Sequence, residues 1–296
     1  MRKAALILWK FSRPHTIIGS VVSISALYAM VAENESEHLL LLLTALLIGI
    51  SCNLYIVGIN QIEDVELDKI NKPFLPIASG ELSVKNAKWI VYSSFIFCSI
   101  LASILSPLLL AIVIISMGIG WGYSRPPFYL RKHHLPAALS ISIVRGVMVN
   151  LGGFLVFQKL IYNTYKLNGD IIALVFFVVI FSVVIAWFKD IPDVKGDKLF
   201  KLKSLPILYS SKTVLNIGFG LVSSAYICCI VYFGTQLERN FSRYDILFYG
   251  HIIVFFTFLT YFIKSNKSDE KSLRRFYKTY WMFFFAEYIV FLLASI

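Results

Sequence analysis

The stretch IIALVFFVVIFSVVIAWF, residues 171–188, contains no charged side chain and no proline. Its length is close to the roughly 20 apolar residues that one crossing of a lipid bilayer requires. Eight further mostly apolar runs cover residues 15–32, 39–59, 89–105, 107–122, 136–157, 214–234, 245–263 and 280–296. The runs do not alternate in polarity as barrel strands do, so they predict helices. We therefore predict an all-α integral membrane protein with about nine transmembrane helices, forming a single domain over residues 1–296.

The composition excludes several other classes of protein. Hydrophobic residues make up 58% of the chain and charged residues only 15%, whereas soluble proteins carry about 25% charged residues. The four cysteines lie in apolar runs without a CxxC pair, which argues against a disulfide framework or a zinc site and predicts buried small hydrophobic side chains. A soluble enzyme and a secreted disulfide-rich scaffold are both excluded.

The net charge of +11 indicates topology rather than nucleic-acid binding. When the amino terminus is placed in the cytoplasm, 23 of the 28 Lys and Arg residues fall on the cytoplasmic side. Basic residues collect in the cytoplasmic loops of membrane proteins. We therefore expect a cytoplasmic amino terminus, a lipid bilayer around the protein and no nucleic-acid partner.

Acidic residues are clustered in two loops on this predicted cytoplasmic side. The first cluster, NQIEDVELD, places Asn60, Asp64 and Asp68 at intervals of four residues. Residues at this spacing share one face of a helix. We therefore expect a single polar stripe at the end of the second apolar run.

The second cluster, KDIPDVKGD at residues 189–197, places Asp190, Asp193 and Asp197 after the sixth run. Pro192 and Gly196 predict that the helix unwinds nearby. A solvated loop balanced by lysines is an adequate explanation for either cluster alone. Two clusters on one side of the membrane favour Mg²⁺, which prefers oxygen ligands and is commonly shared between carboxylates and a substrate phosphate.

Both motifs resemble those of the UbiA-type intramembrane prenyltransferases, which carry N-x-x-x-D-x-x-x-D and D-x-x-D-x-x-x-D in a bundle of nine helices around a central cavity. The chain is most similar to the homogentisate phytyl, geranylgeranyl and solanesyl transferases of this family. The matching segments are WKFSRPHT at 9–16, NQIEDVELD at 60–68, NKPFLPIASG at 71–80, YSRPP at 123–127, VRG at 144–146 and KDIPDVKGD at 189–197.

The resemblance implies a Mg²⁺-dependent transfer of an isoprenoid chain from a prenyl diphosphate to a ring carbon of an aromatic acceptor. Two Mg²⁺ ions are expected, one held by Asp64 and Asp68 and the other by Asp193 and Asp197, which are the expected catalytic residues. Asn60 and Asp190 are expected as supporting metal ligands. The candidates for binding the diphosphate are Lys72, Arg131, Lys189 and Lys198.

Two further groups of residues complete the predicted site. Aromatic faces stabilise a carbocation, and the candidates for this role are Tyr123, Phe154, Trp187 and Phe188, each of which can also be ordinary packing. Arg145 lies within an apolar run, where a charge is costly and usually faces a polar cavity. With Asn150 it is a candidate for binding the acceptor's carboxylate, although a lipid headgroup or a structural ion pair would also account for it.

Several alternatives remain open at this level. Homogentisate, which would lose its carboxyl group as carbon dioxide, is the expected acceptor; 4-hydroxybenzoate, another phenol, a chlorin or a lipid alcohol are the alternatives. A transporter is a minor alternative, because the acidic residues cluster at one side of the membrane rather than in the middle of paired helices. The 130-residue spacing of the motifs suggests two weakly related four-helix halves plus a ninth helix. The expected location is a prokaryotic inner membrane or an organelle membrane.

Overall fold

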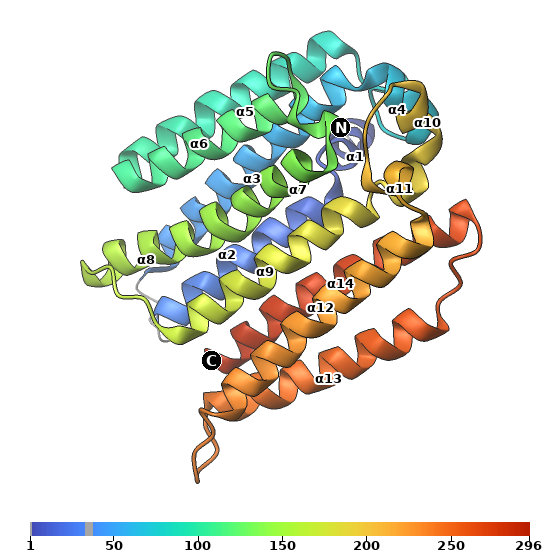
Figure 1. Ribbon diagram of the computed structural model, residues 1–296. Helices are drawn as coiled ribbons and strands as arrows, with labels where there is room; N and C mark the ends of the chain where they lie inside the picture. Colours follow the sequence, from blue (N-terminus) through green and yellow to red (C-terminus); the bar gives the residue numbers. More distant parts are fainter. Residues whose placement is uncertain (1, 33–37) are drawn as a thin grey trace.

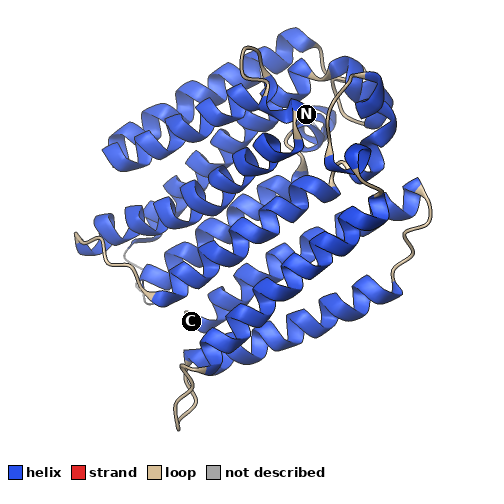
Figure 2. Ribbon diagram, viewed as in Figure 1, coloured by secondary structure: helices blue, strands red, loops and turns tan. Residues whose placement is uncertain are grey.

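The computed structural model describes residues 2–32 and 38–296 as a bundle of long helices joined by short loops (Figures 1 and 2). Within these residues there is no β-strand, only an isolated bridge between His133 and Lys203. The predicted all-α membrane fold is confirmed.

The helices follow one another in this order: α1 (Arg2–Phe11), α2 (Pro14–Ala32), α3 (Leu39–Glu63), α4 (Val65–Asn71), α5 (Val84–Leu105), α6 (Pro107–Ser124), η2 (Leu130–Lys132), α7 (His134–Ser142), η3 (Ile143–Gly152), α8 (Gly153–Tyr162), α9 (Gly169–Phe188), η4 (Ile191–Asp193), α10 (Val194–Leu199), α11 (Leu205–Leu208), α12 (Ser211–Gly234), α13 (Arg243–Lys264) and α14 (Glu270–Ala294).

Eight helical segments among the described residues are long and apolar enough to cross a bilayer. They correspond to the first eight predicted runs. The ninth run lies in α14, a 25-residue helix whose first turns carry several charged side chains. The total of nine spanning helices therefore stays a prediction.

The boundary between the third and fourth runs lies where the sequence predicts it. Helix α5 ends at Leu105, Ser106 adopts an extended backbone, and Pro107 begins α6. The Ser106 hydroxyl accepts a hydrogen bond from the backbone N–H of Leu109. A proline in the first turn and a serine cap are favourable at a helix start, so the local sequence explains the break.

The fifth run forms one continuous rod whose middle is not an α-helix. Helix α7 leads into a ten-residue π-helix, η3, which leads into α8. π-helical turns are rare and frequently occur at functional sites. Arg145 and Asn150 both lie in this segment.

Buried side chains form two separate cores. One joins α3, α5 and α6, and the other joins α2, α8, α9, α12, α13 and α14 (Figure 1). The second core is strongly aromatic; for example, Phe181 stacks on Tyr280 with ring centroids 4.5 Å apart. A cavity of about 1010 Å³ has walls from both groups of helices, chiefly α2, α3, α6, η3 and α14.

The four cysteines are free. Cys98 and Cys229 are buried as predicted, and Cys52 is half-buried. Cys228 is exposed on the outer face of α12, contrary to the prediction, because neighbouring residues of a helix point in different directions.

Candidate active site

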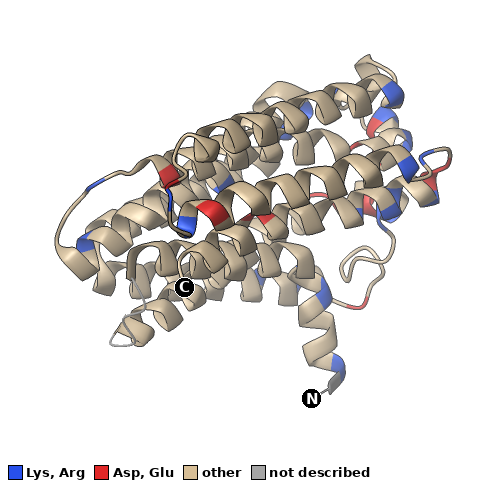
Figure 3. Cartoon of the chain, turned by 90° about the horizontal axis from the view of Figure 1, so that it is seen from below, with Lys and Arg blue, Asp and Glu red and all other residues tan. Residues whose placement is uncertain are grey.

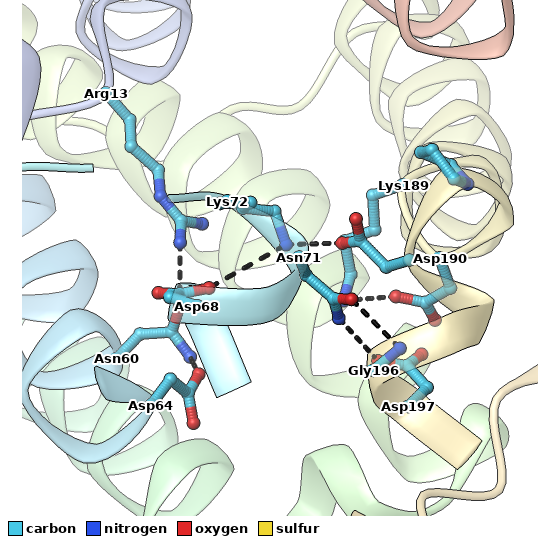
Figure 4. Close-up of polar contacts among 12 residues, drawn as sticks. Arg13, Asn60, Asp64, Asp68, Asn71, Lys72, Lys189, Asp190, Gly196 and Asp197 are labelled. Atoms are coloured by element: carbon cyan, nitrogen blue, oxygen red, sulfur yellow. Dashed lines mark hydrogen bonds and ion pairs between the residues drawn. The ribbon is translucent and has the colours of Figure 1, made fainter. Parts of the chain in front are cut away.

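The first acidic motif spans the junction between α3 and α4. Asp64 interrupts the helix, but the backbone N–H groups of Asp64, Asp68 and Lys72 each bond to the carbonyl oxygen four residues earlier. This helical register keeps Asn60, Asp64 and Asp68 on one side (Figure 4). The Asn60 amide donates to Asp64 Oδ2 at 2.7 Å and thereby orients that carboxylate.

The second motif lies where the chain unwinds after α9. Lys189 and Asp190 form a turn, the 3₁₀ segment η4 ends at Asp193, and Asp197 lies in the short helix α10. The break falls around Pro192, as the sequence predicts.

Direct hydrogen bonds join the two motifs. The Asn71 side chain donates to Asp197 Oδ1 at 3.2 Å and accepts from the backbone N–H of Gly196 at 3.1 Å (Figure 4). A β-carbon at position 196 would lie 2.2 Å from the Asn71 oxygen, so only glycine permits this approach. Segments more than 120 residues apart are thereby fixed into one cluster.

Each of the four predicted catalytic aspartates is almost fully buried: Asp64, Asp68, Asp193 and Asp197 are 3–6% exposed. Burial raises the pKa of the Asp68 carboxyl, against the lowering effect of the nearby Lys72 ammonium. Asp68 Oδ2 is buried and has no hydrogen-bond partner among the residues that the structure describes. A buried carboxylate oxygen normally requires a donor or a cation.

Basic side chains from five parts of the chain converge on the acidic cluster. Arg131 pairs with Asp64, and Lys72 bridges the two motifs by pairing with Asp193 while its Nζ lies 4.0 Å from Asp68. Three further contacts complete the set: Arg13 to Asn60 at 3.1 Å, Lys189 to Asp190 at 2.9 Å and Arg274 to Asp193 at 3.5 Å. Most of the Lys and Arg residues gather at this end of the bundle (Figure 3).

The cluster forms the polar mouth of the large cavity, whose remaining walls are mainly apolar. The cavity is lined by eleven of the predicted site residues: Asn60, Asp64, Asp68, Lys72, Tyr123, Arg131, Arg145, Lys189, Asp190, Asp193 and Asp197. The Tyr123 hydroxyl accepts a hydrogen bond from Lys189 at 2.9 Å, which places this ring beside the charged residues. A mouth of paired acidic and basic side chains thus opens into a mainly apolar chamber.

The UbiA prenyltransferase family model matches residues 20–286, which include both aspartate motifs. The chain belongs to the UbiA prenyltransferase family. Its membership explains why two carboxylate motifs meet at the mouth of an apolar cavity, and it identifies the protein as a prenyltransferase.

Two relatives and one solved structure illustrate the similarity to this UbiA-family chain. The homogentisate phytyltransferase of Synechocystis is 34% identical over 97% of this chain and 94% of its own length. The homogentisate solanesyltransferase of Arabidopsis thaliana is 32% identical over 96% of this chain and 75% of its own length. A UbiA homologue from Archaeoglobus fulgidus bound to GPP and Mg²⁺ shares the fold, with a TM-score of 0.66 at 15% identity over 97% of this chain and 99% of that one.

Five predicted residues of this UbiA-family protein lie away from the cavity. Phe154 and Phe188 are buried in the aromatic core, and Trp187 packs against that core. These three rings therefore pack between helices and do not face the chamber, which corrects their predicted role.

Lys198 borders a separate pocket beside Lys195, because the unwound segment before α10 turns its side chain away from the mouth. Asn150 is fully buried behind the cavity wall.

Other residues of the site were missed by the sequence analysis. Arg13 and Asn71 belong to segments quoted for the family resemblance, but nothing in their spacing indicates a contact with the aspartates. Arg274 also bonds to the backbone oxygen of Asn71 at 2.9 Å, from a helix about 200 residues further along the chain. In the chamber, Trp281 and Phe284 of α14 provide aromatic rings that the sequence analysis did not single out, in addition to the predicted Tyr123.

Proposed function

We propose that this UbiA-family enzyme transfers a long isoprenoid chain from an allylic diphosphate to a ring carbon of homogentisate. The observation that carries the proposal is the meeting of two aspartate motifs and five basic side chains at the mouth of an apolar cavity of about 1010 Å³. The acceptor is inferred from the relatives, which are homogentisate phytyl and solanesyl transferases.

The residues at the mouth fit a divalent metal. They offer hard oxygen ligands, and Asp68 Oδ2 is a buried carboxylate oxygen without a partner in the described part of the chain. Asp64 and Asp68 would hold one Mg²⁺ and Asp193 and Asp197 a second, with Asn60 and Asp190 in support. Bound Mg²⁺ would stabilise the negative charge that develops on the departing diphosphate.

The basic residues would bind the diphosphate. Lys72, Arg131 and Arg274 pair with aspartates of the cluster. Their side chains line the cavity, so their donors could turn from the aspartates to phosphate oxygens. Charge-assisted hydrogen bonds of this kind are among the strongest in proteins. Lys189, which is held by Tyr123 and Asp190, would serve as a fourth donor at the same mouth.

The transfer itself needs no redox partner. The C1–O bond of the donor breaks and its electron pair leaves with the diphosphate, while a ring carbon of the acceptor forms the new carbon–carbon bond and releases its proton. Loss of the acceptor's carboxylate as carbon dioxide leaves an electron pair on the side-chain carbon, which takes up one proton. The apolar chamber would hold the prenyl chain and exclude water from the carbocation.

The distribution of basic residues supports an active site on the cytoplasmic side of an inner or organelle membrane. Both aspartate motifs lie on the predicted cytoplasmic side, whose segments together contain 23 of the 28 Lys and Arg residues. Labelling of a cysteine introduced at Lys85 by a membrane-impermeant reagent in intact cells would contradict this orientation.

A reconstituted assay tests the proposed function. Detergent-solubilised protein is incubated with Mg²⁺, homogentisate and labelled phytyl or geranylgeranyl diphosphate, and parallel reactions contain 4-hydroxybenzoate, other phenols, a chlorin or a lipid alcohol. We expect prenylated product from homogentisate, lost on chelation with EDTA and restored by Mg²⁺. Product from another acceptor alone would change the substrate assignment. A transporter would form no product with any of them.

A further inference from the structure

Arg145 is a charged residue in the middle of the bundle that forms no ion pair with the described part of the chain. It lies in the π-helix η3 and lines the cavity. Its Nη1 is buried and has no hydrogen-bond partner within residues 2–32 and 38–296. A charge inside a membrane helix is costly and usually pairs with another group or faces a ligand, so this guanidinium lacks the anion that would stabilise it.

Two aromatic rings hold the guanidinium in place. Its central carbon lies 4.7 Å from the ring centroid of Trp281 and 5.6 Å from that of Phe284, both on α14. Stacking restricts the arginine side chain and leaves its planar edge available for a carboxylate.

The π-helix is stabilised by a short chain of hydrogen bonds behind Arg145. The Asn150 amide donates to the backbone oxygen of Arg145 at 2.6 Å, and the Tyr288 hydroxyl donates to Asn150 Oδ1 at 3.0 Å. Both polar ends of Asn150 are therefore occupied, and this residue lies behind the cavity wall. Asn150 and Tyr288 can position Arg145 but do not contact a ligand in the cavity.

The unpaired guanidinium lies close enough to the aspartate cluster to act on the same reaction. Arg274, which contacts Asp193, and Trp281, which stacks on Arg145, are seven residues apart on α14. This separation is about 10 Å along the helix axis. On α2, His15 packs against Trp281 with ring centroids 4.8 Å apart, two residues after the Arg13 that contacts Asn60.

We propose that Arg145 binds the carboxylate of a small aromatic acid acceptor, with Asn150 and Tyr288 as positioning residues. This inference rests on the proposed function, because it assigns the acceptor's place in the same cavity. It predicts that the enzyme selects acids over neutral phenols through this one contact. Arg145 is then a residue that determines specificity, whereas the aspartate mouth binds the donor.

The test compares homogentisate with its methyl ester in nanodiscs of neutral lipid. In Arg145→Met, we expect the KM for the acid to rise by about 10- to 100-fold, as loss of a charge-assisted hydrogen bond implies, while the KM for the ester and for the donor stays unchanged. Arg145→Lys should recover part of the preference, because it keeps the charge but not the planar fork. An equal effect on acid and ester would overturn the proposal.

Two matched controls separate positioning from general damage. The quantity compared is the acid-to-ester ratio, that is, kcat/KM for homogentisate divided by kcat/KM for its methyl ester. Lys159→Met removes a positive charge from α8 outside the cavity and should leave this ratio unchanged. Tyr288→Phe should lower the ratio by about 3- to 10-fold. Tyr226→Phe, at another fully buried tyrosine whose hydroxyl has no hydrogen-bond partner, should not change it. An unchanged ratio in Tyr288→Phe would remove its positioning role.

Failure of this inference can be distinguished from failure of the proposed function. If the wild-type enzyme prenylates neither compound, direct calorimetric binding still tests the subsite, since homogentisate should bind the wild type but not Arg145→Met. If both proteins prenylate the acid with the same KM, prenyl transfer stands and the subsite is wrong. Addition of anionic lipid that raises the acid's KM only in the wild type would assign Arg145 to a lipid headgroup instead.

Discussion

Buried acidic groups occur in two regions of this protein, and their surroundings differ. At the mouth, Asp193 pairs with Lys72 and Arg274, whose long side chains also line the open cavity. In the C-terminal helices, Glu287 pairs with His251 at 2.9 Å, and both side chains are completely buried. The second His251 nitrogen lies 2.5 Å from the backbone oxygen of Leu247, so both ring nitrogens have a partner.

The difference separates ion pairs that ligands can replace from ion pairs that support the fold. The mouth pairs border a cavity, so a metal ion or a phosphate can reach either partner. The His251–Glu287 pair is enclosed by Phe233, Phe291 and neighbouring helices, so a ligand cannot reach either side chain and replace its partner. Substitutions in the two regions should therefore affect different measurements.

The largest effect is expected from Asp193→Asn. This change would remove a proposed metal ligand while keeping the shape of the side chain, so kcat should fall by about 10²- to 10³-fold. The melting temperature in detergent should change little, because Lys72 and Arg274, which lose a charged partner, line the open cavity and can reach water. Turnover assays and thermal unfolding measure the two outcomes. Retained turnover would contradict the proposal that both aspartate motifs bind the metal ions.

Glu287→Leu should have the opposite pattern. Breaking a buried ion pair leaves His251 without its counter-charge and should cost about 3 kcal/mol of unfolding free energy, or roughly 6–12 °C in melting temperature. The kcat of the folded fraction should stay within about threefold of the wild type. Glu238→Leu, at an exposed glutamate, is the control for loss of a carboxylate. A catalytic loss without destabilisation would erase the distinction between the two regions.

The smallest effects distinguish two lysines that the sequence analysis assigned to the diphosphate. Lys72→Met should raise the donor's KM by about 10- to 30-fold, since the proposed charged hydrogen bond to the diphosphate would be lost. Lys198→Met should change it by less than about twofold, because Lys198 borders a different pocket. Steady-state kinetics with varied prenyl diphosphate measures both values. Equal effects would restore Lys198 to the donor site.

The sequence predicts those features that depend on local spacing. Apolar runs mark the helices because a bilayer sets their length, and the intervals in the first motif place Asn60, Asp64 and Asp68 on one side. The break at Ser106-Pro107 follows from the local preferences of serine and proline. In these cases the physical cause lies within a few residues of the feature.

Features that depend on helix rotation or on distant contacts could not be predicted in the same way. Helix α9 is apolar on all sides, so nothing in its sequence shows that Phe188 faces the core rather than the cavity. The π-helix around Arg145 depends on Tyr288, 143 residues further along the chain. Arg274 likewise reaches the motifs only through the packing of α14.

The contacts of Arg274 also set an order for the biogenesis of the enzyme. This arginine joins Asn71 and Asp193 from the last helix of the chain. During synthesis, both aspartate motifs leave the ribosome long before the side chain that fastens them together. A nascent chain therefore lacks this connection between the two motifs until α14 has joined the bundle.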